Sequence, residues 1–264
     1  MNAPVHVTVW GAGRTGAARA VLVHGTMTWG TDGYGFAAQR PLADHAELLI
    51  VDRRGFGASP DVERSDYEVD AADVAELVRP GAHLVGHSYG AVVAMLAAAI
   101  RPTEVRSLTL IEPSAHRAAA HDPVVAGALA QMRASVAEAP AMTPREWLRA
   151  STEAVGLAPL EPTSARLRAA ANAMRERPCW EADVPLAELA GAAFPKLVIC
   201  GTWKRAPAAY REAAGEALMA CAEVVARAVG AELLRVEGAS HWPHAERPEA
   251  VNAALRRLWR SVPG

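Results

Sequence analysis

Gly86-His87-Ser88-Tyr89-Gly90 is the stretch on which the interpretation of the fold depends. Residues 83–85 before it are typical of the end of a short buried strand, and the alanine-rich residues 91–99 after it predict a buried helix. A strand that turns directly into a helix forces the corner residue into a strained backbone conformation. Glycines two positions before and after that residue let the chain pass close to its neighbours. The pattern G-x-S-x-G therefore predicts a sharp corner that exposes the Ser88 hydroxyl above a sheet.

The composition is that of a globular protein. The chain has 264 residues, of which 51% are hydrophobic and 21% charged, so it can bury a full core as one α/β domain with a small inserted lid. The formal net charge of −2 gives no indication of a nucleic-acid or anionic-membrane partner. No basic region followed by an apolar run opens the sequence, and no apolar run approaches the ~20 residues of a membrane helix. We therefore expect a cytoplasmic monomer or homodimer that binds neither nucleic acid nor membrane.

Two further patterns argue against cofactors and metals. Cys179, Cys200 and Cys221 are odd in number and form no close pair, which disfavours a disulfide framework or a zinc site. Residues 11–16 match G-x-G-x-x-G, but the strand-like run 20–23 follows them, whereas a dinucleotide fingerprint opens a helix. We interpret residues 11–16 as a glycine-rich turn and expect no cofactor and no metal.

Strand-like and helix-like segments alternate along most of the chain. β-rich or apolar runs predict strands at 5–10, 20–23, 48–51, 83–85, 107–111, 195–201 and 232–236. The intervening patterns predict helices at 34–45, 67–79, 91–99, 208–229 and 248–261. This alternation predicts a mostly parallel sheet with helices on both faces. Between 114 and 193 the strand-like runs disappear, and helices at about 122–138, 144–155 and 163–176 suggest a helical lid.

The chain resembles the α/β-hydrolases over nearly its whole length. The segments that carry the resemblance occur in the family's order and spacing: Val23-His24-Gly25, Asp52-Arg53-Arg54-Gly55-Phe56-Gly57-Ala58-Ser59, Gly86-His87-Ser88-Tyr89-Gly90, Leu110-Ile111-Glu112-Pro113 and Gly238-Ala239-Ser240-His241. The resemblance implies an α/β-hydrolase core of residues 1–113 and 194–264. It also implies a helical lid, or cap, of residues 114–193, inserted between the sixth and seventh strands of the family's order. Members of the family act on many bond types, so the fold does not fix the substrate.

The family's motifs imply a nucleophile and a base. Ser88 is the expected nucleophile, and a serine hydroxyl needs a base within hydrogen-bond reach. The alternative is that Ser88 merely caps an ordinary helix. His241, in the loop after the last strand, is the expected base. Among the alternatives, His24 and His87 flank motif glycines where packing roles are usual, and His244 is expected at the surface.

The backbone N–H groups of Thr26 and Tyr89 are the expected oxyanion donors, because the family forms its oxyanion hole at these positions. The alternative is that these amides only cap local turns. A hole of this kind stabilises the charge that develops on a carbonyl oxygen during acyl transfer.

The third member of the triad departs from the commonest family pattern. Many relatives carry an aspartate a few residues after the strand that ends near Gly201, whereas residues 202–207 contain no acid, and the next carboxylate is Glu212 inside a predicted helix. Some relatives place the acid at the end of the sixth strand, where Glu112 stands. Glu112 is therefore the expected acid, and the alternative is a structural carboxylate beside Pro113. Asp52 is expected to hold the loop that follows its strand.

These residues together imply a serine hydrolase that cleaves a small ester or thioester through an acyl-enzyme on Ser88. The expected partner is a small-molecule acyl substrate. Two alternatives remain open: a lyase or cyclase of a secondary-metabolite pathway using the same triad, and a non-catalytic ligand-binding member of the fold.

Overall fold

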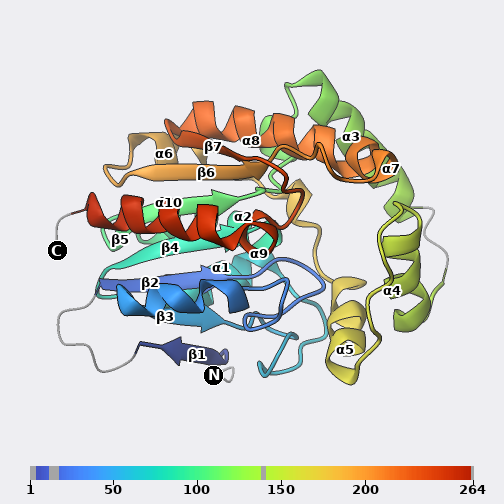
Figure 1. Cartoon of the computed structure of the whole chain (residues 1–264), viewed down its shortest axis with the longest axis horizontal. Coiled ribbons are helices and arrows are strands. Elements are labelled where there is room, and N and C mark those ends of the chain that lie inside the picture. The colour runs from blue at the N-terminus through green and yellow to red at the C-terminus, as the bar shows by residue number, and fades with distance from the viewer. Residues whose placement is uncertain (1–3, 12–17, 138–140, 263–264) are drawn as a thin grey trace.

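A single seven-stranded sheet forms the centre of the computed structural model, which describes residues 4–11, 18–137 and 141–262 (Figure 1). The strand order is β1-β3-β2-β4-β5-β6-β7, and every neighbouring pair is parallel except β1 with β3. The strands are β1 Val7–Trp10, β2 Ala18–Val23, β3 Ala46–Val51, β4 Ala82–His87, β5 Val105–Ile111, β6 Lys196–Gly201 and β7 Glu232–Val236. The predicted α/β-hydrolase sheet, mostly parallel, is confirmed.

Both faces of the sheet are buried, as the apolar strand sequences require. In β2, Val21 and Val23 face one core cluster, while Ala20 and Leu22 face the other, since successive side chains of a strand point to opposite faces. One cluster lies under helices α1, α2, α6 and α8, and the other lies under η1 and α10. Strands covered on both sides explain why the central runs are apolar rather than alternating.

Most of the predicted helices are present at about the predicted positions. They are η1 Ala37–Asp44, α1 Tyr67–Leu77, α2 Tyr89–Ile100, η2 Arg117–Ala119, α3 Pro123–Ala137, α4 Pro144–Glu153, α5 Ser164–Ala173, η3 Cys179–Glu181, α6 Leu186–Gly191, α7 Ala208–Tyr210, η4 Arg211–Gly215, α8 Glu216–Val229, α9 Pro243–Glu246 and α10 Pro248–Arg260. Among the described residues, no helix has the length and apolar character needed to cross a bilayer.

Elements α3 to α6 lie between β5 and β6 in the sequence, within the segment predicted as the cap. Figure 1 shows α4 and α5 standing beside the edge of the sheet where the parallel strands end, whereas α6 lies over the sheet near α8. Both α4 and α5 begin at a threonine whose hydroxyl accepts a backbone N–H of the first turn, Thr143 and Thr163 respectively. We propose that residues 114–193 act as the cap.

Two helices differ from the prediction for identifiable reasons. The segment predicted as a helix at 34–45 is a 3₁₀ helix, η1, with Pro41 inside it; proline lacks the N–H that an α-helix interior needs and collides with the preceding turn. The helix predicted at 208–229 widens into a π-helical segment, η4, at the point where the Trp203 ring packs against Gly215. Of the predicted glycine-rich turn at 11–16, only Gly11 lies within the described residues.

Candidate active site

Ser88 stands at a strained corner between β4 and α2. Its backbone has φ 54° and ψ −115°, a conformation that L-residues seldom adopt. A Cβ on Gly86 would lie 2.1 Å from the Gly90 carbonyl oxygen, and one on Gly90 would lie 2.1 Å from the Val23 carbonyl oxygen. Glycine is therefore required on both sides of the corner, as the motif predicted, and it brings α2 close against β2 and β4.

His241 lies in the loop between β7 and α9, and its Nε2 is 3.1 Å from the Ser88 Oγ. The carbonyl of His241 accepts a hydrogen bond from His87 Nε2 at 2.8 Å. Burial lowers the pKa of His87 well below its ordinary value, with neighbouring His244 and His241 acting in the same direction. A neutral His87 therefore holds the loop that carries His241 without adding a charge beside it.

Glu112 follows β5, and one of its carboxylate oxygens, Oε2, lies 3.8 Å from Nδ1 of His241. This is an ion-pair distance rather than a hydrogen bond; contacts of this kind often tighten only when substrate is bound. Within the described part of the chain, no other carboxylate oxygen lies within 4 Å of a ring nitrogen of His241. Glu212 is exposed in η4, so the structure brings Glu112 to His241 and leaves the alternative acid outside.

The other carboxylate oxygen of Glu112 is held by the chain that follows β6. Its Oε1 accepts hydrogen bonds from the Gly201 N–H at 2.6 Å and from Trp203 Nε1 at 3.3 Å. Burial raises the pKa of this fully enclosed carboxyl, while His241 and these two donors act against the rise. The arrangement leaves Oε2 directed to His241 and supplies donors that favour the charged form.

Thr26 lines the same pocket as Ser88, and Tyr89 follows Ser88 in the chain. Parallel β2 and β4 are neighbours, with Val23 opposite Gly86, so the turn after β2 and the corner after β4 meet at the same edge. A Cβ on Gly25 would lie 3.1 Å from the Ser88 Cβ, which shows how closely the turn approaches. Tyr89 is the first residue of α2, where a helix has no internal acceptors for its N–H groups.

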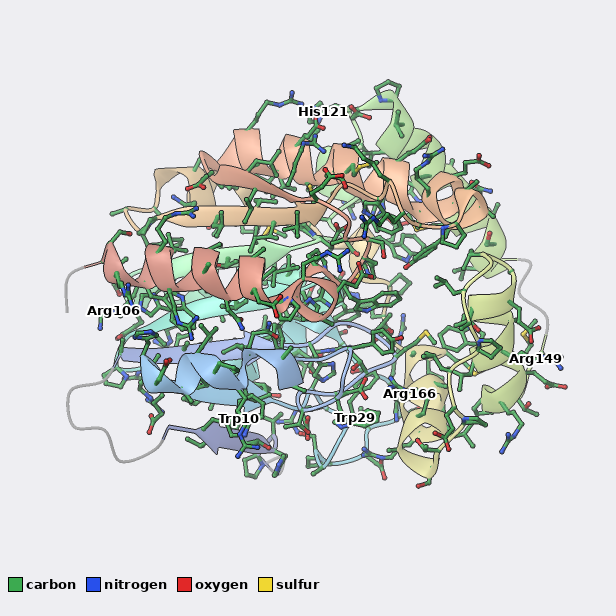
Figure 2. The ribbon with its side chains drawn as sticks, in the orientation of Figure 1. Trp10, Trp29, Arg106, His121, Arg149 and Arg166 are labelled. Atoms are coloured by element: carbon green, nitrogen blue, oxygen red, sulfur yellow. The ribbon has the colours of Figure 1, made fainter. Side chains whose placement is uncertain are left out.

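A pocket of about 210 Å³ opens onto Ser88 and His241. Its wall combines side chains from core loops with side chains from the predicted cap. The lining residues are Thr26, Met27, Thr28, Tyr34, His87, Ser88, Ser151, Thr152, Leu157, Leu160, Arg166, Tyr210, His241 and Trp242. Arg166 reaches from α5 toward the loop that carries Trp29, and its guanidinium carbon lies 4.8 Å from the centre of that indole ring (Figure 2). An apolar wall with a few polar groups suits a small organic substrate.

The other motif residues have structural roles. Asp52 accepts the N–H of Gly30 and that of Ala58 at 2.8 and 2.9 Å, so it holds its loop as predicted. His24 Nε2 accepts the Arg53 N–H at 3.0 Å, which agrees with its expected packing role. The expected surface position of His244 is wrong. Its side chain is fully buried beside His87 and Phe36, because the short helix α9 turns it inward.

Sequence reasoning missed several residues near the site. Ser114 Oγ lies 3.2 Å from Ser88 Oγ, and Trp203 and Glu176 hold groups of the site from separate loops. No local pattern marks these residues. In the described part of the chain, no three histidine, cysteine, aspartate or glutamate side chains are grouped so as to hold a metal ion.

Solved structures share the fold over nearly the whole chain. A thermophilic esterase from Thermogutta terrifontis has a TM-score of 0.64 and 24% identity, covering 97% of this chain and 93% of its own. An enol-lactonase from Burkholderia xenovorans has a TM-score of 0.60 and 23% identity, covering 97% and 96%. At such identities these likenesses show a common fold.

Sequence comparison adds a more local likeness and the family. A pimeloyl-[acyl-carrier protein] methyl ester esterase from Aeromonas salmonicida is 39% identical over 99 residues, or 36% of this chain and 37% of that protein. The chain thus matches little more than a third of the length of this curated relative. The model of the Alpha/beta hydrolase family matches residues 20–254. With most of the chain matched, and with the strand order and the corner at Ser88 that go with it, this protein belongs to the alpha/beta hydrolase family.

Proposed function

We propose that this protein is a serine hydrolase that cleaves a small carboxylic ester or thioester through an acyl-enzyme on Ser88. The observation that carries the proposal is the 3.1 Å contact between Ser88 Oγ and His241 Nε2, both of which line the pocket. The local likeness to the methyl ester esterase described above supports an ester as the substrate class.

In this mechanism His241 takes the Ser88 proton as Oγ attacks the substrate carbonyl carbon. The oxyanion that forms is stabilised by the N–H groups of Thr26 and Tyr89. Collapse of the tetrahedral intermediate breaks the bond to the leaving alcohol or thiol, which receives its proton from His241. Water, deprotonated by His241, then attacks the acyl-enzyme, and a second tetrahedral intermediate releases the acid and restores Ser88. Glu112 orients His241 and stabilises its charged form throughout.

The test combines turnover and labelling. The wild-type chain should hydrolyse p-nitrophenyl acetate and butyrate and should gain one adduct from a serine-reactive phosphonate, located on Ser88 by peptide mass. Ser88→Ala should abolish labelling and lower kcat by roughly a millionfold, since triad members act as a unit, with unfolding behaviour unchanged.

Ser114→Ala is the matched control, because this second hydroxyl lies only 3.2 Å from Ser88. It should keep the label and most of the turnover. Labelling that follows Ser114 instead of Ser88, or full activity in Ser88→Ala, would contradict the proposed mechanism. Acyl esters and thioesters of graded length, assayed on the same preparation, would then define the acyl group that the pocket accepts.

A further inference from the structure

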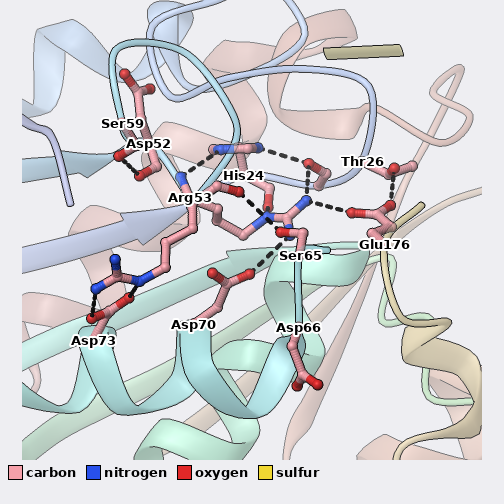
Figure 3. A network of polar contacts seen from close by, with 12 residues as sticks. His24, Thr26, Asp52, Arg53, Ser59, Ser65, Asp66, Asp70, Asp73 and Glu176 are labelled. Carbon is pink, nitrogen blue, oxygen red and sulfur yellow. Dashed lines mark hydrogen bonds and ion pairs between the residues drawn. The ribbon is translucent and has the colours of Figure 1, made fainter. Parts of the chain in front are cut away.

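A buried charge cluster lies beside the turn that carries Thr26 (Figure 3). Its centre is Arg53, whose side chain is 1% exposed and forms ion pairs with Asp70 at 3.0 Å and with Glu176 at 3.1 Å. Asp70 comes from α1, and Glu176 comes from the segment between α5 and η3, inside the predicted cap. The cluster thus joins three distant parts of the chain, and the mechanism above does not use it.

The Arg53 guanidinium also holds the backbone beside Thr26. Its Nε donates to the His24 carbonyl at 3.2 Å and its Nη2 donates to the Gly25 carbonyl at 3.1 Å. The guanidinium carbon lies 3.9 Å from the centre of the Tyr89 ring. A planar group with several fixed donors can fix such a backbone geometry. Arg53 therefore contacts both parts of the proposed oxyanion hole. It binds the turn that carries Thr26, and it packs against the ring of Tyr89.

Glu176 links this cluster to Thr26 itself. Its Oε2 pairs with Arg53, and its Oε1 accepts the hydroxyl of Thr26. The Glu176 side chain is only 8% exposed, whereas Thr26 is half-buried and lines the pocket. Burial raises the pKa of the Glu176 carboxyl and Arg53 acts against the rise. The bond to Thr26 is therefore a specific, partly buried contact between the predicted cap and the turn.

The next residue of the turn is tied to the cap as well. Arg166 of α5 donates from Nη1 to the Met27 carbonyl at 2.7 Å and pairs through Nη2 with Asp32 at 2.8 Å. Met27 has φ 60°, a left-handed conformation that a methionine keeps only when its surroundings hold it. Side chains from the cap segment thus bind two successive residues of the turn.

Resting on the proposed function, we propose that Glu176 is a positioning residue for the oxyanion hole. Glu176 accepts the Thr26 hydroxyl and pairs with Arg53, which also binds the neighbouring carbonyls. These contacts together fix the position of the Thr26 N–H. The hydroxyl itself touches no substrate in this proposal. Its role is to keep the turn in place, so that the N–H meets the oxyanion without reorganisation during the reaction.

Asp70 provides the matched control. Asp70 and Glu176 are both buried carboxylates on the same guanidinium, but only Glu176 contacts Thr26. Glu176→Gln should lower kcat about tenfold with little change in KM, because misplacing a donor costs less than the roughly hundred- to thousandfold loss caused by removing one. Asp70→Asn should reduce stability comparably and leave kcat within about twofold of wild type.

A double-mutant cycle with Thr26 tests the coupling, because Thr26→Val removes the hydroxyl and leaves the buried charges of Arg53, Asp70 and Glu176 in place. Thr26→Val should lose about tenfold in kcat, Thr26→Ser should restore it, and the Thr26→Val, Glu176→Gln double variant should lose no more than either single variant. Affinity for a trifluoromethyl ketone, which forms a tetrahedral oxyanion on serine, should fall in parallel with kcat.

Three results would overturn the inference: normal kcat in Thr26→Val, losses that multiply in the double variant, or an equal loss in Asp70→Asn. These comparisons require that the wild-type chain hydrolyses esters and is labelled by the phosphonate on Ser88. A wild-type chain with neither property overturns the proposed function, and the inference with it.

Discussion

Glu112 is a residue whose backbone and side chain are both constrained by its surroundings. Its φ is 47°, unusual for a residue with a side chain, and its N–H donates to the Ile199 carbonyl at 2.8 Å. The side chain is completely buried, with Oε1 held by Gly201 and Trp203. Strain of this kind persists only where several contacts enforce it. The contacts leave Oε2 as the oxygen that faces His241.

We expect Glu112→Gln to lower kcat by roughly a hundredfold to ten-thousandfold without unfolding the chain. The amide keeps the size of the side chain but removes the charge and can present a donor to Nδ1, which selects the wrong tautomer. Steady-state kinetics on p-nitrophenyl butyrate measure the loss, and circular dichroism verifies the fold. Glu212→Gln, an exposed change in η4, is the control and should behave as wild type. Near-normal kcat in Glu112→Gln would point to a Ser88–His241 dyad.

At the scale of elements, the close crossing of α2 over β2 is what places the buried Ser88 in the wall of the pocket. The crossing depends on Gly90, since a methyl group there would lie 2.1 Å from the Val23 carbonyl oxygen and 2.5 Å from that of His24. Both obstacles are backbone atoms of a central strand and of the turn after it, which cannot rotate away. The helix would have to shift outward and carry Ser88 with it.

Gly90→Ala should therefore reduce the free energy of unfolding by about 1–3 kcal/mol, the usual cost of overpacking, and should also lower kcat. Urea denaturation measures the first effect. The matched control is Gly127→Ala in α3, where nothing lies within 4 Å of the added carbon. That change should stabilise the chain by up to about 1 kcal/mol through helix propensity. Equal stability of the two variants would show that the crossing tolerates a side chain.

At the scale of the whole molecule, several buried histidines make the fold sensitive to acid. Burial lowers the pKa of His24 and His87 well below the ordinary value of 6.5, and lowers those of His83 and His244 to about 4. Between pH 6.5 and the folded-state pKa, the unfolded chain binds more protons than the folded chain, so stability falls as pH falls. Burial also raises the pKa values of Asp70, Glu112 and Glu176. These carboxyls act in the opposite direction, because between the ordinary and the raised pKa the folded chain binds more protons than the unfolded chain, so stability falls as pH rises.

His83 lies away from the candidate active site, so a change at this residue measures how much one buried histidine contributes to the loss of stability at low pH. It bonds Ser107 at 2.8 Å and stacks on Trp259. A pKa of about 4, lowered by burial and then by Arg106, predicts that His83 alone removes about 2 kcal/mol of stability between pH 7 and pH 5. In His83→Asn the difference in urea-unfolding free energy between these two pH values should shrink by that amount. An unchanged difference would mean that His83 is not neutral in the folded chain at pH 5.

The sequence by itself determined those parts of the fold that depend on patterns within a few consecutive residues. Strand and helix periodicity located most elements, and the glycines around Ser88 marked the corner, because such signals reside in a few consecutive residues. The resemblance to the family's motif order then identified Ser88, His241 and Glu112 as the expected triad. The π-helical segment η4 depended on the packing of the Trp203 ring against Gly215, which the sequence pattern does not indicate. The 3₁₀ form of η1 follows from Pro41 inside it, a local signal that the helix prediction at 34–45 overlooked.

Only the tertiary structure decided which distant side chains meet. The buried place of His244 follows from a turn of α9 against Phe36 and His87, which nothing in its neighbours' sequence indicates. Glu176 reaches Thr26 across 150 positions of sequence. Contacts of this kind arise when loops that follow different parallel strands converge at one edge of the sheet. Their geometry depends on how the whole chain packs and not on the residues beside them in the sequence.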